Sequence, residues 1–226
     1  MREFQAHVLD LAAGGMDAPQ AAGATRVLSK MLDSRAVVLV EGMSDRSALQ
    51  ALAERRGRNL DREGISVVPM GGATNIGMFL AVFGPHGLGV ELAGLCDAGT
   101  EADIRRALEH AGLGSGLTRV GMESLGFYVC DADLEDELIR AVGSDRVELL
   151  LEEEGDLKTF RALQNQPAYR EKTIDEQLRR FVCTRGRKAR YPRLLVEALD
   201  LARVPRPLDR VLAHVGPSRR SEGHGH

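Results

Sequence analysis

The chain has few aromatic residues and few cysteines, so its composition alone does not indicate a function. It contains no tryptophan, three tyrosines and six phenylalanines among 226 residues, so stacking of bases on aromatic platforms is not the expected mode of recognition. It has three cysteines, Cys96, Cys130 and Cys183, an odd number without the paired spacing of a zinc site. They are typical of buried, reduced thiols in a cytosolic protein.

Long hydrophobic runs and an excess of positive charge are also missing. No apolar stretch approaches the length of a membrane span, and the N-terminus has no signal-peptide run, so we expect a cytoplasmic protein without a membrane partner. The formal net charge is −3, so any nucleic-acid binding must come from a local basic surface. A hydrophobic fraction of 43% is enough for the core of one large domain, or of one domain with an appendage.

Hydrophobic patterning predicts an α/β fold in the first part of the chain. Apolar, β-branched runs at 36–41, 65–69, 90–96 and 126–130 alternate with helical patterns at 44–56, 75–83 and 100–111. This alternation indicates a mostly parallel four-stranded sheet flanked by helices. The glycines at 71 and 72 open the helix at 75–83, either as a tight turn or as a phosphate-binding loop.

The second part of the chain reads as a helical C-terminal half. Helical patterns occupy 134–142, 144–153, 156–165, 174–182, 190–202 and 205–215, and two further helices are expected at 3–14 and 18–34. We therefore divide the chain into N-terminal helices (1–34), an α/β domain (35–143), a helical extension carrying a basic segment (144–215) and a disordered tail (216–226).

Acidic residues follow three of the predicted strands. Glu41 ends the first strand and Asp45 follows it after a glycine turn, at the start of a helix. Asp97 and Asp131 end the third and fourth strands. The carboxyl ends of parallel strands meet at one edge of a sheet, where α/β folds place their sites. Crowded carboxylates repel one another unless a cation is present, and Mg²⁺ prefers oxygen ligands. The pattern predicts a metal site.

The run Glu41-Gly42-x-x-Asp45 after a hydrophobic strand resembles the first motif of the Toprim fold. Its extension, Leu-Val-Glu-Gly-x-Ser-Asp-x-x-Ala-Leu over residues 39–49, is most similar to the Toprim half of OLD-family (overcoming lysogenization defect) nucleases, and the likeness covers roughly residues 36–199. The resemblance implies a Toprim-like Rossmannoid fold and two-metal phosphoryl transfer with Mg²⁺ or Mn²⁺. OLD nucleases usually join an ATPase to this half. The sequence has no Gly-x-x-x-x-Gly-Lys-Ser/Thr loop, so we expect a free-standing Toprim protein or one that works with a separate ATPase.

The resemblance also assigns metal ligands. It makes Glu41 a catalytic metal ligand beside Asp45 and Asp97, and it matches Asp133 and Glu135, in Asp-Ala-Asp-Leu-Glu, to ligands of a second metal. Toprim families normally carry Asp-x-Asp after the third strand, and here Gly99 replaces the second aspartate. Glu101 and Asp131 are further candidate acids. The alternative reading of residues 133–137 is an acidic helix N-terminus that favours the helix dipole.

A basic segment follows: Arg179, Arg180, Arg185, Arg187, Lys188, Arg190 and Arg193. In the related nucleases a lysine in this region stabilises charge on the scissile phosphate, and Lys188 matches it as the catalytic lysine. We assign phosphate or nucleic-acid binding to Arg185, Arg187 and Arg190, because guanidinium groups bind phosphate in bidentate fashion. The alternative is a solvated helix face.

Three functions remain open at this point. The first is a metal-dependent nuclease, with DNA expected before RNA as the partner. The second is a catalytically impaired Toprim module that binds nucleic acid or a partner ATPase, as the glycine at 99 allows. The third is a phosphohydrolase or nucleotidyl transferase on a small phosphorylated substrate. The sequence also leaves a homodimer through the N-terminal helices open.

Overall fold

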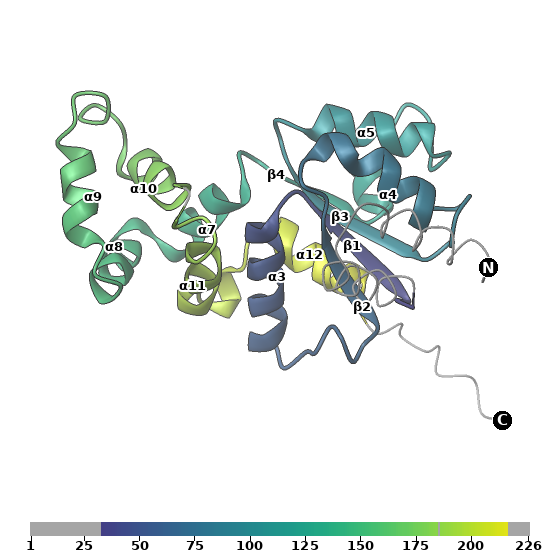
Figure 1. Ribbon diagram of the computed structural model, residues 1–226, viewed down its shortest axis with the longest axis horizontal. Coiled ribbons are helices and arrows are strands. Elements are labelled where there is room, and N and C mark those ends of the chain that lie inside the picture. Colours follow the sequence, from purple (N-terminus) through teal and green to yellow (C-terminus); the bar gives the residue numbers. More distant parts are fainter. Residues whose placement is uncertain (1–32, 185, 217–226) are drawn as a thin grey trace, which may run out of the picture.

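The computed structural model describes residues 33–184 and 186–216. The predicted helices at 3–14 and 18–34, apart from the last two residues of the second, lie outside these ranges, as do Arg185 and residues 217–226. Within the described residues the chain is an α/β protein with a helical C-terminal half, as the sequence predicted (Figure 1).

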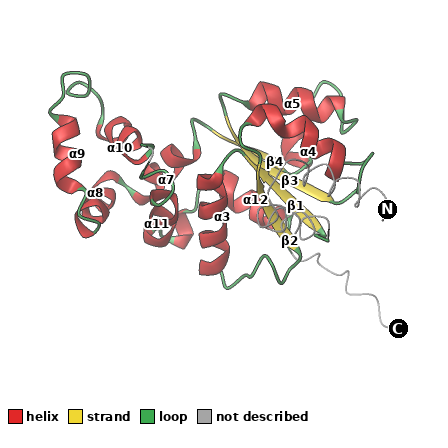
Figure 2. Ribbon diagram, viewed as in Figure 1, coloured by secondary structure: helices red, strands yellow, loops and turns green. Residues whose placement is uncertain are grey.

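Four strands form one parallel sheet (Figure 2). They are β1 (Ala36–Val40), β2 (Ile65–Pro69), β3 (Glu91–Asp97) and β4 (Phe127–Cys130), in the spatial order β2-β1-β3-β4. All three pairings are parallel. The chain leaves β1 toward one edge of the sheet and leaves β3 toward the other. The topological switch point therefore lies between the carboxyl ends of β1 and β3, where open α/β sheets bind ligands.

Both faces of the sheet are covered, which explains why the strands are continuous apolar runs. Residues of β1 alternate between two hydrophobic clusters: Val38 packs into one and Leu39 into the other. The first cluster is completed by α3 (Met43–Arg55) and α12 (Arg206–His214), and the second by α4 (Ile76–Phe83) and α5 (Glu101–His110). Figure 1 shows α4 and α5 on the opposite side of the sheet from α3.

The helical half consists of α7 (Leu134–Val142), α8 (Ser144–Glu153), α9 (Leu157–Gln164), α10 (Ile174–Val182) and α11 (Tyr191–Ala198). Helices α8 to α10 extend away from the sheet, while α11 packs beside α3 and α12 packs beneath β3 and β4 (Figure 1). One hydrophobic cluster includes side chains from both parts, so the division at residue 143 stays a prediction. None of the helices in the described ranges is long and apolar enough to cross a membrane.

Three local features differ from the expected elements. Helix α6 (Arg119–Ser124) was not predicted; it is six residues long, too short for a periodic pattern, and begins where Thr118 Oγ1 accepts a hydrogen bond from the Gly121 amide (3.2 Å). The predicted helix at 190–202 ends at Ala198, followed by the 3₁₀ turn η2 (Leu201–Arg203). The glycines at 71 and 72 take φ of 72° and 125°, and a 3₁₀ turn, η1 (Ala73–Asn75), precedes α4.

Candidate metal centre

Glu41 and Asp97 flank the switch point of the sheet. Glu41 is the first residue after β1, and Asp97 is the last residue of β3. The Glu41 Oε1 atom accepts hydrogen bonds from the backbone amide of Asp97 (3.0 Å) and from the Thr100 hydroxyl. These two donors turn the Glu41 carboxylate toward the end of β3, so the two acids share one side of the switch point.

Asp45 joins them from the first turn of α3. Its Oδ2 atom accepts a hydrogen bond from the Gly42 amide (2.7 Å), which closes the turn between β1 and α3, and its side chain is 8% exposed. Burial raises the pKa of Asp45 to about 6; the Gly42 amide opposes the shift, and the charges of Glu135 and Glu41 add to it. Burial likewise raises the pKa of Asp97 to about 7, with Glu41 and Asp45 as the next causes. Burial and neighbouring negative charges therefore both disfavour the ionised forms of Asp45 and Asp97.

Helix α7 brings two more acids. Asp133 is its N-cap: Oδ1 accepts from the Asp136 amide (2.8 Å), and Oδ2 accepts from the Arg179 guanidinium (2.7 Å from Nε). Glu135 is 2% exposed, and its Oε1 atom has no hydrogen-bond partner among the described residues. Burial raises the pKa of Glu135. A buried carboxylate oxygen without a donor is costly, which is the situation that a bound cation relieves.

Lys188 forms an ion pair with Glu135 in the described part of the chain. Its Nζ lies 3.8 Å from Glu135 Oε1, within ion-pair range but beyond a hydrogen bond, and its side chain is 53% exposed. Burial disfavours the charge of Lys188, but Glu135, then Cys183, Asp45 and Asp97, outweigh it and hold its pKa above the usual value. Lys188 is therefore charged at neutral pH and has room to move toward an anionic ligand.

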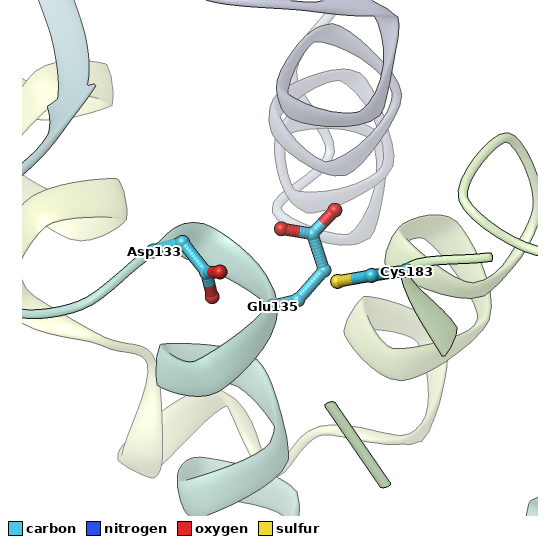
Figure 3. A group of neighbouring side chains, drawn as sticks. All are labelled: Asp133, Glu135 and Cys183. Carbon is cyan, nitrogen blue, oxygen red and sulfur yellow. The ribbon is translucent and has the colours of Figure 1, made fainter. Parts of the chain in front are cut away.

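Asp133, Glu135 and Cys183 form the tightest group of potential metal ligands in the described part of the chain. One ligand atom from each lies within 4.8 Å of the others. Figure 3 shows the two carboxylates at the start of α7 and the Cys183 side chain pointing toward Glu135 from the segment that follows α10. Burial, with Glu135 and Asp133 adding, raises the pKa of the Cys183 thiol to about 12. Cys96 and Cys130 are buried as predicted, whereas Cys183 is half-buried beside these carboxylates.

The donor chemistry of this centre fits a divalent cation. Carboxylate oxygens are the ligands of Mg²⁺ and Mn²⁺. Burial, with neighbouring carboxylates adding, raises the pKa values of Asp45, Asp97 and Glu135, and a bound cation would favour their ionised forms. The unpartnered oxygen of Glu135 points to the same requirement.

Comparisons with known proteins agree with this geometry. A family model described as "Overcoming lysogenization defect protein-like, TOPRIM domain" matches residues 34–98, which include Glu41, Asp45 and Asp97. Residues 34–98 are therefore similar to an OLD-like Toprim domain. No curated protein sequence matches significantly.

Solved structures extend the likeness beyond the Toprim motif. The C-terminal region of the Burkholderia pseudomallei OLD protein superposes with a TM-score of 0.64 at 23% identity, covering 80% of this chain and 97% of that one. The C-terminal region of the Xanthomonas campestris pv. campestris OLD protein gives a TM-score of 0.66 at 26% identity, covering 82% and 94%. The fold similarity therefore takes in the helical half as well as the Toprim domain.

The two additional acids predicted for the Toprim domain lie in a different environment. Arg119 contacts Glu101 (2.7 Å) and Asp131 (3.2 Å), and the Asp131 side chain is 71% exposed. Both carboxylates are thus partly neutralised by an arginine. Gly99 stands in the position of the missing aspartate, and no atom of the described residues lies within 4 Å of a Cβ added there.

Two arginines of the basic segment contact a carboxylate of their own chain. Arg187 and Arg190 each donate to Asp156 (2.8 Å), and the Arg187 guanidinium stacks 3.9 Å from the centroid of Phe181. Their side chains are thereby held in a separate ion-pair network, so their phosphate-binding role stays a prediction without support from their contacts. Arg185 lies outside the described residues. Among the described residues of this segment, Lys188 and Arg179 contact the carboxylates of the centre.

Sequence reasoning missed three contributors to the centre. Thr100 orients Glu41, Arg179 pairs with Asp133, and Cys183 lies against Asp133 and Glu135. Thr100 follows Asp97 by three residues, so its position just after the end of a predicted strand could have marked it as part of the site. The other two contacts join residues 46 and more positions apart in the chain, and no local pattern marks them.

Proposed function

We propose that this protein is a divalent-metal-dependent phosphodiester hydrolase that acts on nucleic acid, with DNA the expected substrate before RNA. One observation carries the proposal: the charges of Glu41, Asp45, Asp133 and Glu135 all raise the pKa of Asp97, after burial, and Lys188 lies 3.8 Å from Glu135. The similarity to OLD C-terminal regions supports it.

The acids divide into two ligand sets. Glu41, Asp45 and Asp97 would hold one Mg²⁺ or Mn²⁺ ion at the switch point, and Asp133 and Glu135 would hold the second. Bound together, two such ions activate water and neutralise the leaving oxygen of a phosphodiester. The proposal gives Lys188 the role of binding a phosphate oxygen, because its charged amine is half exposed and makes only a long contact with Glu135. Thr100 and the Asp97 amide position Glu41.

Cleavage assays with a matched pair of variants test this proposal. Supercoiled DNA, linear DNA and a structured RNA are incubated with Mg²⁺, Mn²⁺ or chelator and with wild type, Glu41→Gln or Glu54→Gln. Glu54 is an exposed acid near the end of α3 that pairs with Arg193 of α11, so the control removes the same charge outside the centre. We expect metal-dependent cleavage by wild type and Glu54→Gln and none by Glu41→Gln. Cleavage that survives chelator or the Glu41→Gln change would refute the proposed chemistry.

Gly99 favours a second candidate, a Toprim module that binds nucleic acid or a partner ATPase without cleaving. The position leaves the first metal set with one carboxylate fewer than the usual Toprim pattern. A folded wild-type protein that binds DNA with Mg²⁺ present but cleaves no substrate with either metal would establish this second function in place of the first.

A further inference from the structure

A groove of about 420 Å³ opens beside the metal centre. It shares Asp133 and Lys188 with the centre, and it runs along α10 to the segment that joins α9 to α10. Four of its side chains are basic, namely Lys172, Arg179, Arg180 and Lys188, against the two acids Asp133 and Glu176. The groove thus has a positive formal charge on a chain whose overall charge is −3.

The far wall of the groove is fixed in place by a buried glutamine. Gln177 is 7% exposed; its Nε2 donates to the carbonyls of Tyr169 (2.8 Å) and Lys172 (3.0 Å), and its Oε1 accepts from Gln164 (2.7 Å). These bonds tie residues 169–172 to α10. A site whose walls are held by buried hydrogen bonds loses less conformational entropy on binding than a loose surface does.

Neighbouring side chains also orient two of the basic residues of the groove. Arg180 Nε donates to the Tyr169 hydroxyl (3.0 Å), and Lys172 contacts Glu176 (3.2 Å), which is itself held by the capping box with Thr173. Lys172 contacts Glu176, which lies four residues before Arg180, about 6 Å along α10. The positive charges are therefore spread over more than one turn, a distance that a single phosphate does not span but a chain of phosphates does.

We infer that this groove binds the polynucleotide strand next to the scissile phosphate and leads it to the metal centre. The inference rests on the proposed function for the identity of the ligand. Lys172 and Arg180 contact phosphates beyond the reacting one, so they act in binding rather than in the chemical step.

The test removes two groove charges and compares them with two charges elsewhere. Lys172→Gln/Arg180→Gln changes exposed residues of the groove, and Arg62→Gln/Arg203→Gln makes the same charge change at exposed positions outside it. Binding of a fluorescent single-stranded oligonucleotide is followed by anisotropy over a range of KCl concentrations, in Ca²⁺ without turnover. We expect the groove variant to bind about 10-fold or more weakly, with a salt slope smaller by about one to two, and the control to resemble wild type.

Cleavage kinetics separate the groove from the centre. For the oligonucleotide, the groove variant should raise KM and leave kcat within about twofold, and for bis(p-nitrophenyl) phosphate, which reaches only the centre, its kcat/KM should equal that of wild type. Equal weakening by both double variants, or no binding by wild type, would overturn the groove assignment. If wild type binds through the groove but cleaves neither substrate, the proposed function fails while the groove assignment stands.

Discussion

Two acidic sites of this protein, Asp156 and the metal centre, have opposite surroundings. Asp156 accepts hydrogen bonds from Arg187 (2.8 Å), Arg190 (2.8 Å) and the Tyr191 hydroxyl (2.7 Å). The Arg187 hydrogen bond, opposed by burial and aided by Tyr191, holds the pKa of Asp156 below its usual value. In the metal centre, burial and neighbouring carboxylates raise the pKa of Asp45 to about 6 and of Asp97 to about 7.

The contrast separates an acid that stabilises the fold from the acids that the proposed function makes metal ligands. Asp156 is balanced by cations of its own chain, so its charge stabilises the folded state without help. Burial and nearby like charges raise the pKa values of Asp45, Asp97 and Glu135, so these three destabilise the folded state when ionised. Glu135 also keeps an oxygen without a hydrogen-bond donor among the described residues. Strongly perturbed groups of the second kind gather at functional sites. Arg187 and Arg190, which the sequence predicted as phosphate ligands, are the cations that balance Asp156.

The largest expected effect is that of Asp97→Asn on cleavage. The variant removes a carboxylate from the first ligand set while keeping its shape, and we expect metal-dependent cleavage to fall about 1,000-fold or more. The free energy of unfolding without metal should not fall at pH 8, because the ionised Asp97 is unfavourable there. Cleavage assays and urea unfolding measure the two quantities. A variant that is equally active would remove Asp97 from the centre.

Asp156→Ala should show the reverse pattern. Loss of the carboxylate leaves the half-buried Arg187 and the fully buried Tyr191 without their shared acceptor, so we expect the free energy of unfolding to fall by about 2–4 kcal/mol. Cleavage by the folded fraction should change less than about threefold. The control Asp145→Ala, at an exposed position in the first turn of α8, should cost about 0.5 kcal/mol or less. A large activity loss with unchanged stability would place Asp156 in the site instead.

Asp156 and the metal centre should also affect stability in opposite ways as pH changes. Asp45 and Asp97 have raised pKa values in the folded state, so the unfolded state releases their protons first, and stability without metal falls as pH rises from about 4 to about 7. For the buried Asp45 alone this amounts to about 1–3 kcal/mol. Asp156, with a lowered pKa, loses its contribution only as pH falls below its usual range.

Thermal unfolding in chelator and in Mg²⁺, at pH 5 and pH 8, checks this response. Mg²⁺ should stabilise the protein more at pH 8, where the ligands are ionised, than at pH 5. Asp45→Asn should flatten the pH dependence in chelator. A Mg²⁺ effect of the same size at both values would mean that these carboxylates do not bind the ion.

Local sequence patterns were sufficient for most of the fold. The strand at 65–69 and the helices at 134–142 and 174–182 have the predicted bounds, because apolar runs and helical periodicity act over a few residues. The same locality located Glu41 and Asp97: a residue at the end of a parallel strand lies at the site edge whatever its distant neighbours are. Helix α6 was not predicted because its six residues are too few to show a helical periodicity.

The remaining parts of the site depend on contacts between distant residues. Arg187 and Arg190 meet Asp156 from 31 and 34 residues away, and Arg179 meets Asp133 from 46. A basic residue in a sequence looks the same whether it faces a phosphate or a carboxylate of its own chain, so only the tertiary packing separates these arginines from Lys188. The buried Gln177, which fixes the groove wall, is likewise invisible to hydrophobic patterning.

The smallest expected effect comes from adding an acid to the sheet edge at Gly99. No atom of the described residues obstructs a Cβ there, and the position is outside the left-handed region that favours glycine, so Gly99→Asp should fold. It restores the Asp-x-Asp spacing after β3, and we expect Mg²⁺ affinity at pH 8, measured by calorimetry, to rise about 3- to 10-fold. The stability without metal should fall further with rising pH, because another like charge joins Glu41 and Asp97. Gly99→Asn, which has the same size without the charge, should do neither. If both variants change affinity equally, then the glycine matters for backbone shape, and the centre binds its metal with the ligands it already has.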